Sequence, residues 1–295
     1  MNRSISIVAA TILWLSPFAT TATAADCDRD CLASVVTQYL EALVEHSPAK
    51  LPLSGSVKFT ENTVQKRPGE GFWQTAAKRR ESRPGTVPYR LDVLDAERGM
   101  AVTFGVFEEN GAPVLHVARL KVVDGLVTEL ETMIVRSQPD GGGIFEPQML
   151  QHPSDAMTRV PAADAIERRA AAVAIAEHYP AGIRVGSFVN VDAPFARSAY
   201  RLENGRLMAG PGCTFAQGCG DIKTQRIPTY PATYRVIAYD EQLGIVVLRQ
   251  NYGPRPYDAS IELHTWHAFK VYGGEIHAVE AFQNVMPTGT KSGWD

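Results

Sequence analysis

The chain has 295 residues, with 29 lysines and arginines against 32 aspartates and glutamates, which gives a formal net charge of −3. This balance argues against a nucleic-acid partner, because binding to a phosphate backbone needs a concentrated basic surface. The basic run Lys78–Arg83 is typical of a solvated loop. The sequence has no phosphate-binding loop, dinucleotide fingerprint or nucleophile motif, so it predicts no cofactor.

Residues 1–24 predict a secretory signal peptide. Arg3 precedes an apolar run over residues 5–18, and the segment closes on the small-residue pattern Ala22-Thr23-Ala24. The apolar run is shorter than the ~20 residues that span a bilayer, which favours cleavage after Ala24 over retention as an anchor. We therefore expect an exported protein, periplasmic or extracellular, with no membrane segment after cleavage.

The four cysteines come in two close pairs, Cys27 with Cys31 and Cys213 with Cys219. An even count in an exported chain predicts two disulfides, for which three connectivities are open. We favour bonds that cross between the pairs, because these would tie the amino terminus to the loop GCTFAQGCG. The spacings of four and six match a four-cysteine zinc site poorly, so no metal is expected there.

Two helices and a loop between them divide the chain. One helical stripe over residues 30–46 consists of Leu32, Val35, Val36, Tyr39, Leu40 and Leu43. A second stripe, over residues 163–183, consists of Ile166, Ala170, Val173, Ile175 and Tyr179. The intervening segment is rich in Pro, Gly, Ser and Asp, which is typical of a linker or a long crossing loop. We predict a first domain at 25–136, a linker at 137–161 and a second domain at 162–295.

The strands that follow each helix repeat. YRLDVLDAERGMAV (Tyr89–Val102) aligns with YRVIAYDEQLGIVV (Tyr234–Val247), and RLKVVDGLVTELE (Arg119–Glu131) aligns with AFKVYGGEIHAVE (Ala268–Glu280). Glu61-Asn62 and Glu203-Asn204 correspond more weakly. Tight-turn sequences separate the strands. The pattern predicts a duplicated α+β unit of about 130 residues, in which a helix covers a curved antiparallel sheet.

The repeated unit resembles a known family. Its helical start, the TEN sequence, GEGFW (Gly69–Trp73) and the closing RLKVVDGLVTELE are similar to SnoaL-like domains of the nuclear transport factor 2-like superfamily, closest to a group of exported proteins from bacteria and fungi. The likeness covers the mature chain twice and implies cone-shaped domains with a pocket between sheet and helices. It implies varied functions, including cofactor-free isomerases, dehydratases, hydrolases, cyclases and lyases, and non-catalytic scaffolds. Function must therefore be argued at the site.

The stretch HTWHAFKVYGGEIHAVE, residues 264–280, holds three of the seven histidines. With a two-residue turn at Gly273-Gly274, His267 stands directly opposite Glu280 on an otherwise apolar face. Opposed Cβ atoms lie ~4.5–5.5 Å apart, which allows a hydrogen bond between these side chains. A carboxylate beside an imidazole raises the pKa of the imidazole, so we predict His267 and Glu280 as the catalytic pair. The alternative is a buried polar pair that only fixes the strand register.

The same hairpin argues against a metal site. His264 and His277 face away from His267, so the three histidines do not converge as zinc ligands must. In the first repeat, a turn at Asp124-Gly125 places Ala118 opposite Glu131, without a histidine at that position. We therefore expect the second half to hold the more elaborate site.

Other residues are candidates for substrate binding. Arg249 and Asn251, on a predicted strand, suit a carboxylate or a carbonyl group. Tyr234 belongs to a group of tyrosines in the second half whose hydroxyls suit a developing oxyanion. Trp266 lies beside the predicted base. In the first repeat, the candidates are His116, on the same face of the hairpin as Glu131, and Glu131 itself.

Two functions of different classes remain open. The first is a cofactor-independent acid–base enzyme of lyase, dehydratase or isomerase type, acting on a small, partly apolar and possibly aromatic molecule in the cone pocket. The second is a non-catalytic ligand-binding or protein-interaction module. We expect a small-molecule ligand and either a monomer, in which the two halves form a pseudo-dimer, or a homodimer.

Overall fold

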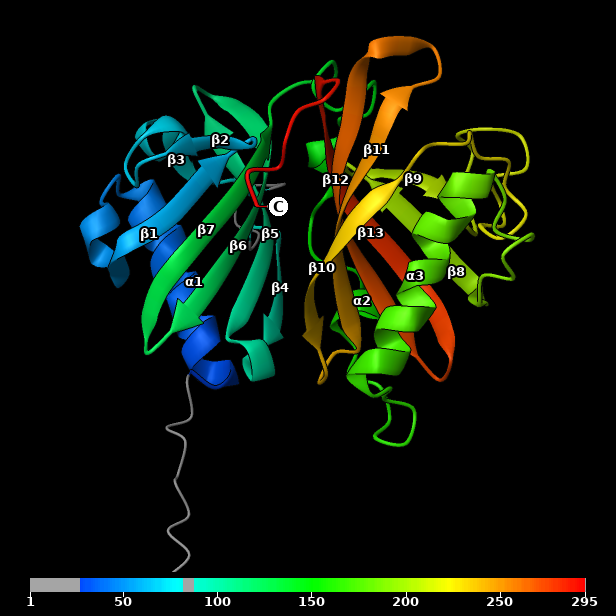
Figure 1. Cartoon of the computed structure of the whole chain (residues 1–295), viewed down its shortest axis with the longest axis horizontal. Helices are drawn as coiled ribbons and strands as arrows, with labels where there is room; N and C mark the ends of the chain where they lie inside the picture. The colour runs from blue at the N-terminus through cyan, green and yellow to red at the C-terminus, as the bar shows by residue number, and fades with distance from the viewer. Residues whose placement is uncertain (1–26, 82–87, 295) are drawn as a thin grey trace, which may run out of the picture.

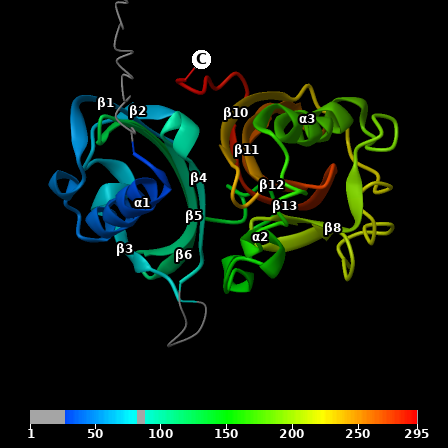
Figure 2. The same cartoon turned by 90° about the horizontal axis from the view of Figure 1, so that it is seen from below.

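The computed structural model describes residues 27–81 and 88–294, and the predicted signal peptide lies outside this range. The chain forms two domains that lie side by side, each a helix partly enclosed by a curved sheet (Figures 1 and 2). The elements of the first domain are α1 (Arg29–Val44), η1 (Pro48–Lys50), β1 (Leu53–Glu61), β2 (Val64–Lys66), η2 (Gly71–Gln74), β3 (Ala76–Arg79), β4 (Arg90–Asp95), η3 (Ala96–Arg98), β5 (Met100–Glu109), β6 (Ala112–Val123) and β7 (Leu126–Val135).

The second domain follows a crossing segment that contains η4 (Pro147–Met149) and α2 (Asp155–Thr158). Its elements are α3 (Arg169–Val185), β8 (Phe195–Glu203), β9 (Arg206–Ala209), β10 (Thr233–Asp240), β11 (Ile245–Arg255), β12 (Asp258–Tyr272) and β13 (Glu275–Pro287). None of the helices in the described part of the chain is long and apolar enough to cross a membrane.

The second sheet and six strands of the first share one topology, which confirms the predicted tandem α+β duplication, and β3 is an addition to the first sheet. The first sheet has the order β2-β1-β7-β6-β5-β3, with β4 also paired to β5, and the second has the order β10-β11-β12-β13-β8-β9. In each, the first strand runs parallel to the last, β1 with β7 and β8 with β13, so the sheets are mixed and not purely antiparallel.

Asn62 and Asn204 support the weaker part of the repeat alignment. Both have positive φ, at 47° and 45°, a conformation that asparagine tolerates better than most residues. The Asn62 side chain bonds both backbone groups of Ile134, and the Asn204 side chain bonds both backbone groups of Gln283. The same asparagine therefore closes the parallel pair of strands in each domain.

The two long helices pack their apolar stripes into the concave sides of the sheets (Figure 2). Helix α1 starts at an Asp28 cap, whose carboxylate accepts from the amide of Cys31 at 3.0 Å, and it buries the whole predicted stripe. Helix α3 begins only at Arg169, so Ile166 of the predicted second stripe lies before it, and Ala170 is exposed. Tyr179 is buried as predicted, and Val173 and Ile175 are half-buried against the same core. The buried residues of α3 are Ala172, Ala176, Tyr179, Pro180, Gly182 and Ile183.

The convex faces of the two sheets pack against each other. This shared core contains Val93, Val102 and Phe104 from the first domain and Trp266 and Phe282 from the second. Strands β4 and β10 lie next to each other in the middle of the molecule (Figure 1). Met157 of α2 is buried in the same core, so the crossing segment is packed against the interface.

The two predicted disulfides are present, but the predicted crossed connectivity is wrong. Cys27 is bonded to Cys31 and Cys213 to Cys219, with Cα atoms 5.1 and 5.7 Å apart. The first pair precedes and begins α1, and the second lies on the β9–β10 loop of the other domain. Each cysteine therefore has only its near neighbour within bonding reach.

Candidate functional site

The predicted pairing of His267 with Glu280 does not occur. The hairpin turns at Gly273-Gly274 as predicted, but His277 forms a β-bulge, and beyond it His267 lies opposite Ala281. One extra residue moves every later side chain to the other face of the sheet. His267 therefore points into the core of the second domain, whereas Glu280 points into the interface between the domains.

The first repeat has the same bulge at the equivalent position. Thr128 is the unpaired residue, and as a result Arg119, not Ala118, lies opposite Glu131. The prediction for this hairpin was thus wrong for the same reason. The Nε atom of Arg119 donates to Glu131 at 3.1 Å.

Glu280 accepts hydrogen bonds from three hydroxyl groups. Tyr200 donates at 2.6 Å, Ser154 at 2.9 Å, and Tyr89, from the first domain, at 3.1 Å. Burial raises the pKa of Glu280 above its ordinary value, and the three hydroxyl groups oppose this shift. The carboxylate therefore joins both domains and the crossing segment.

His267 is buried at the inner end of the second cone. Burial, with the positive charge of Arg201, lowers its pKa to about 3, so the imidazole is neutral at pH 7. Its Nδ1 atom lies 3.0 Å from the Thr265 hydroxyl, and its Nε2 atom lies 3.4 Å from the Tyr252 hydroxyl. Tyr252 in turn lines the larger pocket of this domain.

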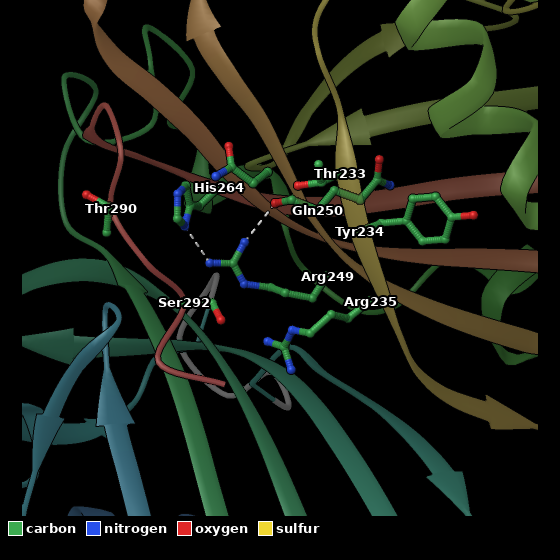
Figure 3. A pocket seen from close by; sticks show the side chains of 9 residues that line it. Thr233, Tyr234, Arg235, Arg249, Gln250, His264, Thr290 and Ser292 are labelled. Atoms are coloured by element: carbon green, nitrogen blue, oxygen red, sulfur yellow. Dashed lines mark hydrogen bonds between the residues drawn. The ribbon is translucent and has the colours of Figure 1, made fainter. Parts of the chain in front are cut away.

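Three of the predicted binding residues meet at a cavity of about 160 Å³ between the domains (Figure 3). Tyr234, Arg249 and Asn251 all line it. Glu131 of the first domain contacts two of its arginines: it accepts from Arg235 at 2.7 Å, and its Oε1 lies 3.8 Å from Nε of Arg249.

The remaining predicted binding residues lie elsewhere. Trp266 is fully buried in the interface core, with the guanidinium of Arg249 5.6 Å from its ring centre. His116 lies in the first cone, where its Nε2 is 2.9 Å from the hydroxyl of Tyr39. Burial lowers the pKa of His116 to about 3. Phe72 and Phe107 also contact this imidazole, so aromatic side chains occupy the concave side of the first domain around it.

The concave side of the second domain contains a larger pocket, of about 350 Å³. Its walls are mainly apolar and aromatic, and its charged groups are few. The apolar and aromatic side chains include Ile183, Met208, Phe215, Ile227, Tyr230, Tyr252 and Leu263; the charged ones are Arg201, Glu203, Arg226 and Arg255.

Arg201 is the buried cation of this pocket, with 6% of its surface exposed. Its two terminal nitrogens donate to Gln225 at 2.9 Å and to the Tyr179 hydroxyl at 3.4 Å. Its Nε lies 3.2 Å from a carboxylate oxygen of Glu203. Burial raises the pKa of Tyr252, so its hydroxyl stays protonated. The pocket therefore combines a guanidinium, a carboxylate and a neutral phenol.

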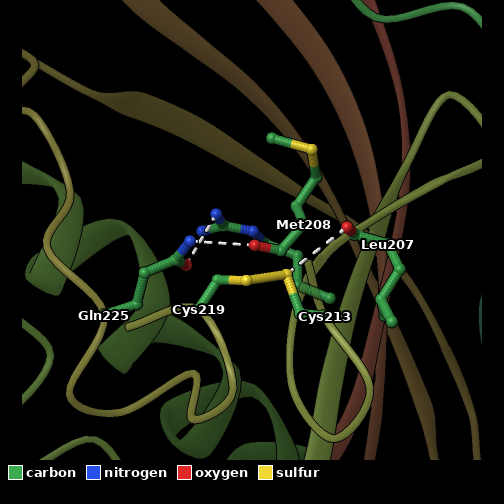
Figure 4. The surroundings of a disulfide bond; sticks show 6 residues. Leu207, Met208, Cys213, Cys219 and Gln225 are labelled. Atoms are coloured by element: carbon green, nitrogen blue, oxygen red, sulfur yellow. Dashed lines mark hydrogen bonds between the residues drawn. A yellow bond between two sulfur atoms is a disulfide. The ribbon is translucent and has the colours of Figure 1, made fainter. Parts of the chain in front are cut away.

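The β9–β10 loop forms one wall of the pocket. Figure 4 shows the disulfide of this loop with Gln225 and Met208 nearby. Its disulfide between Cys213 and Cys219 closes the part of the loop that carries Phe215. Further along the loop, Gln225 donates to the backbone carbonyl of Met208 at 2.8 Å while it accepts from Arg201.

Sequence reasoning missed Arg201 and Glu203. They stand two apart on β8, so they share one face, and this spacing in YRLE was the available signal. Tyr252 was recognised only as one of several tyrosines. Among residues 27–81 and 88–294, no cluster of three or more histidine, cysteine or acidic side chains could hold a metal ion.

Comparison with known families gives a match in each half of the chain. The family model described as "Domain of unknown function (DUF8021)" matches residues 25–134 and again residues 166–283, once in each half. No curated protein matches the chain significantly.

Several solved structures are similar to one half of the chain. A protein of unknown function with a cystatin-like fold from Methylobium petroleophilum is 15% identical, with a TM-score of 0.30 over 38% of this chain and 81% of that one. A "putative ketosteroid isomerase" from Kribbella flavida is 15% identical, with a TM-score of 0.28 over 46% of this chain and 95% of that one. A nuclear transport factor 2-like protein of unknown function from Cytophaga hutchinsonii is 11% identical, with a TM-score of 0.24 over 37% and 91%. At such values these structures do not bear on activity.

Proposed function

The chain belongs, in both of its halves, to the family described as Domain of unknown function (DUF8021); because this membership assigns no activity, we propose a function from the pocket of the second domain. The pocket binds a small, partly apolar organic molecule and moves a proton on it without a cofactor, as an isomerase or lyase does. The observation that carries the proposal is that Glu203, Arg201 and Tyr252 line one pocket with otherwise mainly apolar walls.

Each of the three residues has a role in this chemistry. The Glu203 carboxylate accepts a proton from a carbon next to a carbonyl group, and the C–H electron pair forms a C=C bond. The carbonyl π electrons move to the oxygen, which accepts a hydrogen bond from the Tyr252 hydroxyl, and the nearby positive charge of Arg201 stabilises the negative charge. Return of the proton from Glu203 to the same carbon restores the carbonyl compound, and its return to the far carbon of a C=C bond conjugated with the enolate isomerises it, with no other reactant.

Glu203 replaces His267 as the proposed base. His267 lies beneath Tyr252 and its pKa of about 3 makes it a weak proton acceptor at pH 7. It is a positioning residue in this scheme, because its Nε2 atom is near the Tyr252 hydroxyl. The side chain of Glu203 is 12% exposed, so it is accessible from the pocket.

One observation favours a second function, ligand binding without chemistry. Glu203 and Arg201 form an ion pair at 3.2 Å, and this pairing already engages the carboxylate that would have to accept a proton. In that case the pocket selects and holds the ligand, and no proton is transferred.

Hydrogen–deuterium exchange distinguishes the two functions. Phenylacetone, a small aromatic ketone, exchanges the protons next to its carbonyl group slowly in D₂O, and proton NMR measures the rate. A positioned base accelerates such a step by about 10²–10⁴-fold. We expect acceleration by the wild type, loss of it in Glu203→Gln, and no effect of Glu97→Gln at an exposed carboxylate of the first domain. Binding of phenylacetone without exchange would favour the binding module, and unchanged exchange by Glu203→Gln would exclude Glu203 as the base.

We also propose that the protein is exported. The signal-like residues 1–24 and the two disulfides support this proposal. Amino-terminal sequencing of the protein secreted by a bacterial host should find Ala25 as the first residue. Retention of Met1 in the mature protein would contradict cleavage.

A further inference from the structure

The charges of the second-domain pocket indicate what it binds. Three arginines, Arg201, Arg226 and Arg255, line the pocket against one carboxylate, Glu203. We infer that the ligand is an aromatic or alicyclic carboxylate whose carboxylate group binds Arg201. This inference rests on the proposed function, because it names the class of molecule that enters the same pocket.

Arg201 has the donors for such a contact. Its hydrogen bonds to Gln225 and Tyr179 each use one terminal nitrogen and hold the guanidinium in place. Its Nε is buried and makes no hydrogen bond in the described part of the chain, although Glu203 lies within ion-pair distance. A guanidinium held in this way can bind a second carboxylate through two parallel N–H···O bonds.

The other two arginines reinforce the preference for an anion. Arg255 is half-buried and Arg226 is exposed, so the positive charge extends from the buried end of the pocket towards solvent. Burial of Arg201 beside a single carboxylate leaves a net positive charge on the lining residues. Such an arrangement attracts an anionic ligand and raises its rate of association.

The remaining walls fit a ring. Tyr230 and Tyr252 are stacked with centroids 5.5 Å apart, and Phe215 of the disulfide loop lines the same pocket. Leu263 and Ile183 add aliphatic surface. A volume of about 350 Å³ suits a molecule with a single ring and a short side chain. A polar anion without a ring would leave these walls in contact with water.

The cavity between the domains is a weaker candidate for an anion. Its two arginines already lie beside buried carboxylates, since Arg235 donates to Glu131 and Arg249 contacts a histidine that is paired with Glu262. The charges there are balanced within the protein. The second-domain pocket has an excess of cations, and we assign the carboxylate to it.

Two probes of equal shape test the inference on the wild-type protein. Phenylacetate and phenylacetamide differ only in that the first carries a charged carboxylate. Calorimetric titration should show phenylacetate binding at least ten-fold more tightly, with an affinity that falls as salt is added, whereas the amide should be insensitive to salt. Equal affinities would overturn the inference and leave the proposed function standing.

Two variants test whether Arg201 is the arginine that binds the carboxylate. Arg201→Gln should remove the preference for phenylacetate, and Arg197→Gln, at an exposed position of the same strand, should keep it. Retention of the preference in a folded Arg201→Gln protein would overturn the assignment. Because the comparison of the two probes needs no variant, poor folding of Arg201→Gln leaves the test intact.

The outcomes separate the inference from the function on which it rests. If neither these probes nor phenylacetone bind, both fail. If phenylacetate binds through Arg201 but phenylacetone exchange stays at the buffer rate, the inference holds and the enzymatic part of the proposed function fails. Phenylacetate should also suppress any exchange of phenylacetone, because both would occupy one pocket.

Discussion

Asp95 and Asp240 each accept a hydrogen bond from the backbone of the opposite domain. The Asp95 carboxylate accepts from the amide of Tyr239 at 3.0 Å, and the Asp240 carboxylate accepts from the amide of Leu94 at 2.9 Å. These residues are equivalent in the repeat, so the two contacts are related by an approximate two-fold axis. Such a reciprocal interface is typical of symmetric homodimers, here formed within one chain.

The first residues of the two long helices extend the same symmetry. Arg29, at the start of α1, donates to Asp240 at 2.6 Å, and Arg169, at the start of α3, donates to both oxygens of Asp95. Neither carboxylate is exposed. Asp95 pairing raises the pKa of Arg169, so this arginine remains charged.

Asp240→Asn should therefore destabilise the whole protein. Removing one partner of a buried ion pair costs about 3 kcal/mol, and we expect that loss in the free energy of unfolding from urea titration. Glu97→Gln is the control, because Glu97 also pairs with Arg169 but its side chain is 73% exposed, and exposed pairs contribute at most about 1 kcal/mol. Equal losses in the two variants would show that the buried contacts do not hold the domains together.

The buried histidine of the second cone should make stability depend on pH. The pKa of His267 is lowered in the folded protein to about 3 from an ordinary value of 6.5. The contribution of the neutral imidazole to the free energy of unfolding is therefore fully present above pH 6.5. As pH falls below 6.5 the unfolded chain takes up a proton and the folded protein does not, which lowers stability by about 1.4 kcal/mol per pH unit until pH approaches 3. The difference in unfolding free energy between wild type and His267→Gln should shrink along that slope.

Other groups cancel in this comparison. His116 and Glu280 are present in both proteins, so their own pH dependence drops out of the difference. His152→Gln, at an exposed position, is the control. A difference between wild type and His267→Gln that stays constant from pH 7.5 to 4 would contradict the burial of a neutral imidazole.

Tyr89→Phe should weaken the interface more at high pH than at low pH. The pKa of Glu280 is raised in the folded protein, so its stability contribution is present below its ordinary pKa and is lost as pH rises through the raised value. Above that value the ionised carboxylate depends on its three hydroxyl donors, and loss of the Tyr89 donor costs about 1.5–3 kcal/mol. Urea titrations at pH 8 and pH 4.5 measure the cost, with Tyr257→Phe, which is 95% exposed, as the control. A larger cost at pH 4.5 would reverse the assigned sign.

The local disulfide of the β9–β10 loop should affect binding more than folding. A bond between residues six apart restrains only a short loop, which contributes about 2 kcal/mol in the chain-entropy model. We expect the double variant Cys213→Ser, Cys219→Ser to fold but to bind phenylacetate more weakly, because Phe215 and Gln225 lie on that loop.

Peptide mapping without reduction should find both local bonds, and a Cys27–Cys213 peptide would contradict the connectivity.

The fold could be predicted from the sequence because the sequence patterns that indicate it are local. The apolar stripe of α1 and the Gly273-Gly274 turn each depend on neighbouring residues, and the repeat made the second copy a check on the first. The site could not be predicted, because the register of β12 with β13 depends on one extra residue in the hairpin. Nothing in the composition of IHAVE distinguishes a bulge at His277 from continuous pairing, since histidine is acceptable in both.

The pocket residues were missed for a different reason. Arg201 and Glu203 stand on β8, far in sequence from Tyr252 on β11, and only the parallel pairing of β8 with β13 brings these strands around one pocket. Parallel pairing joins distant segments and leaves no turn sequence to mark it. The prediction of the disulfide connectivity was wrong for a similar reason, because the choice between local and crossed bonds depends on distances between domains.

The chain passes between the two domains twice. The crossing segment leads from the first domain to the second, and the carboxyl-terminal residues return, where Trp294 donates to Thr60 at 2.8 Å and stacks on Arg119. Two separate chains would hold such an interface only above a threshold concentration, whereas a tether fixes the effective concentration of each domain for the other at about the millimolar level. The paired state should therefore survive dilution.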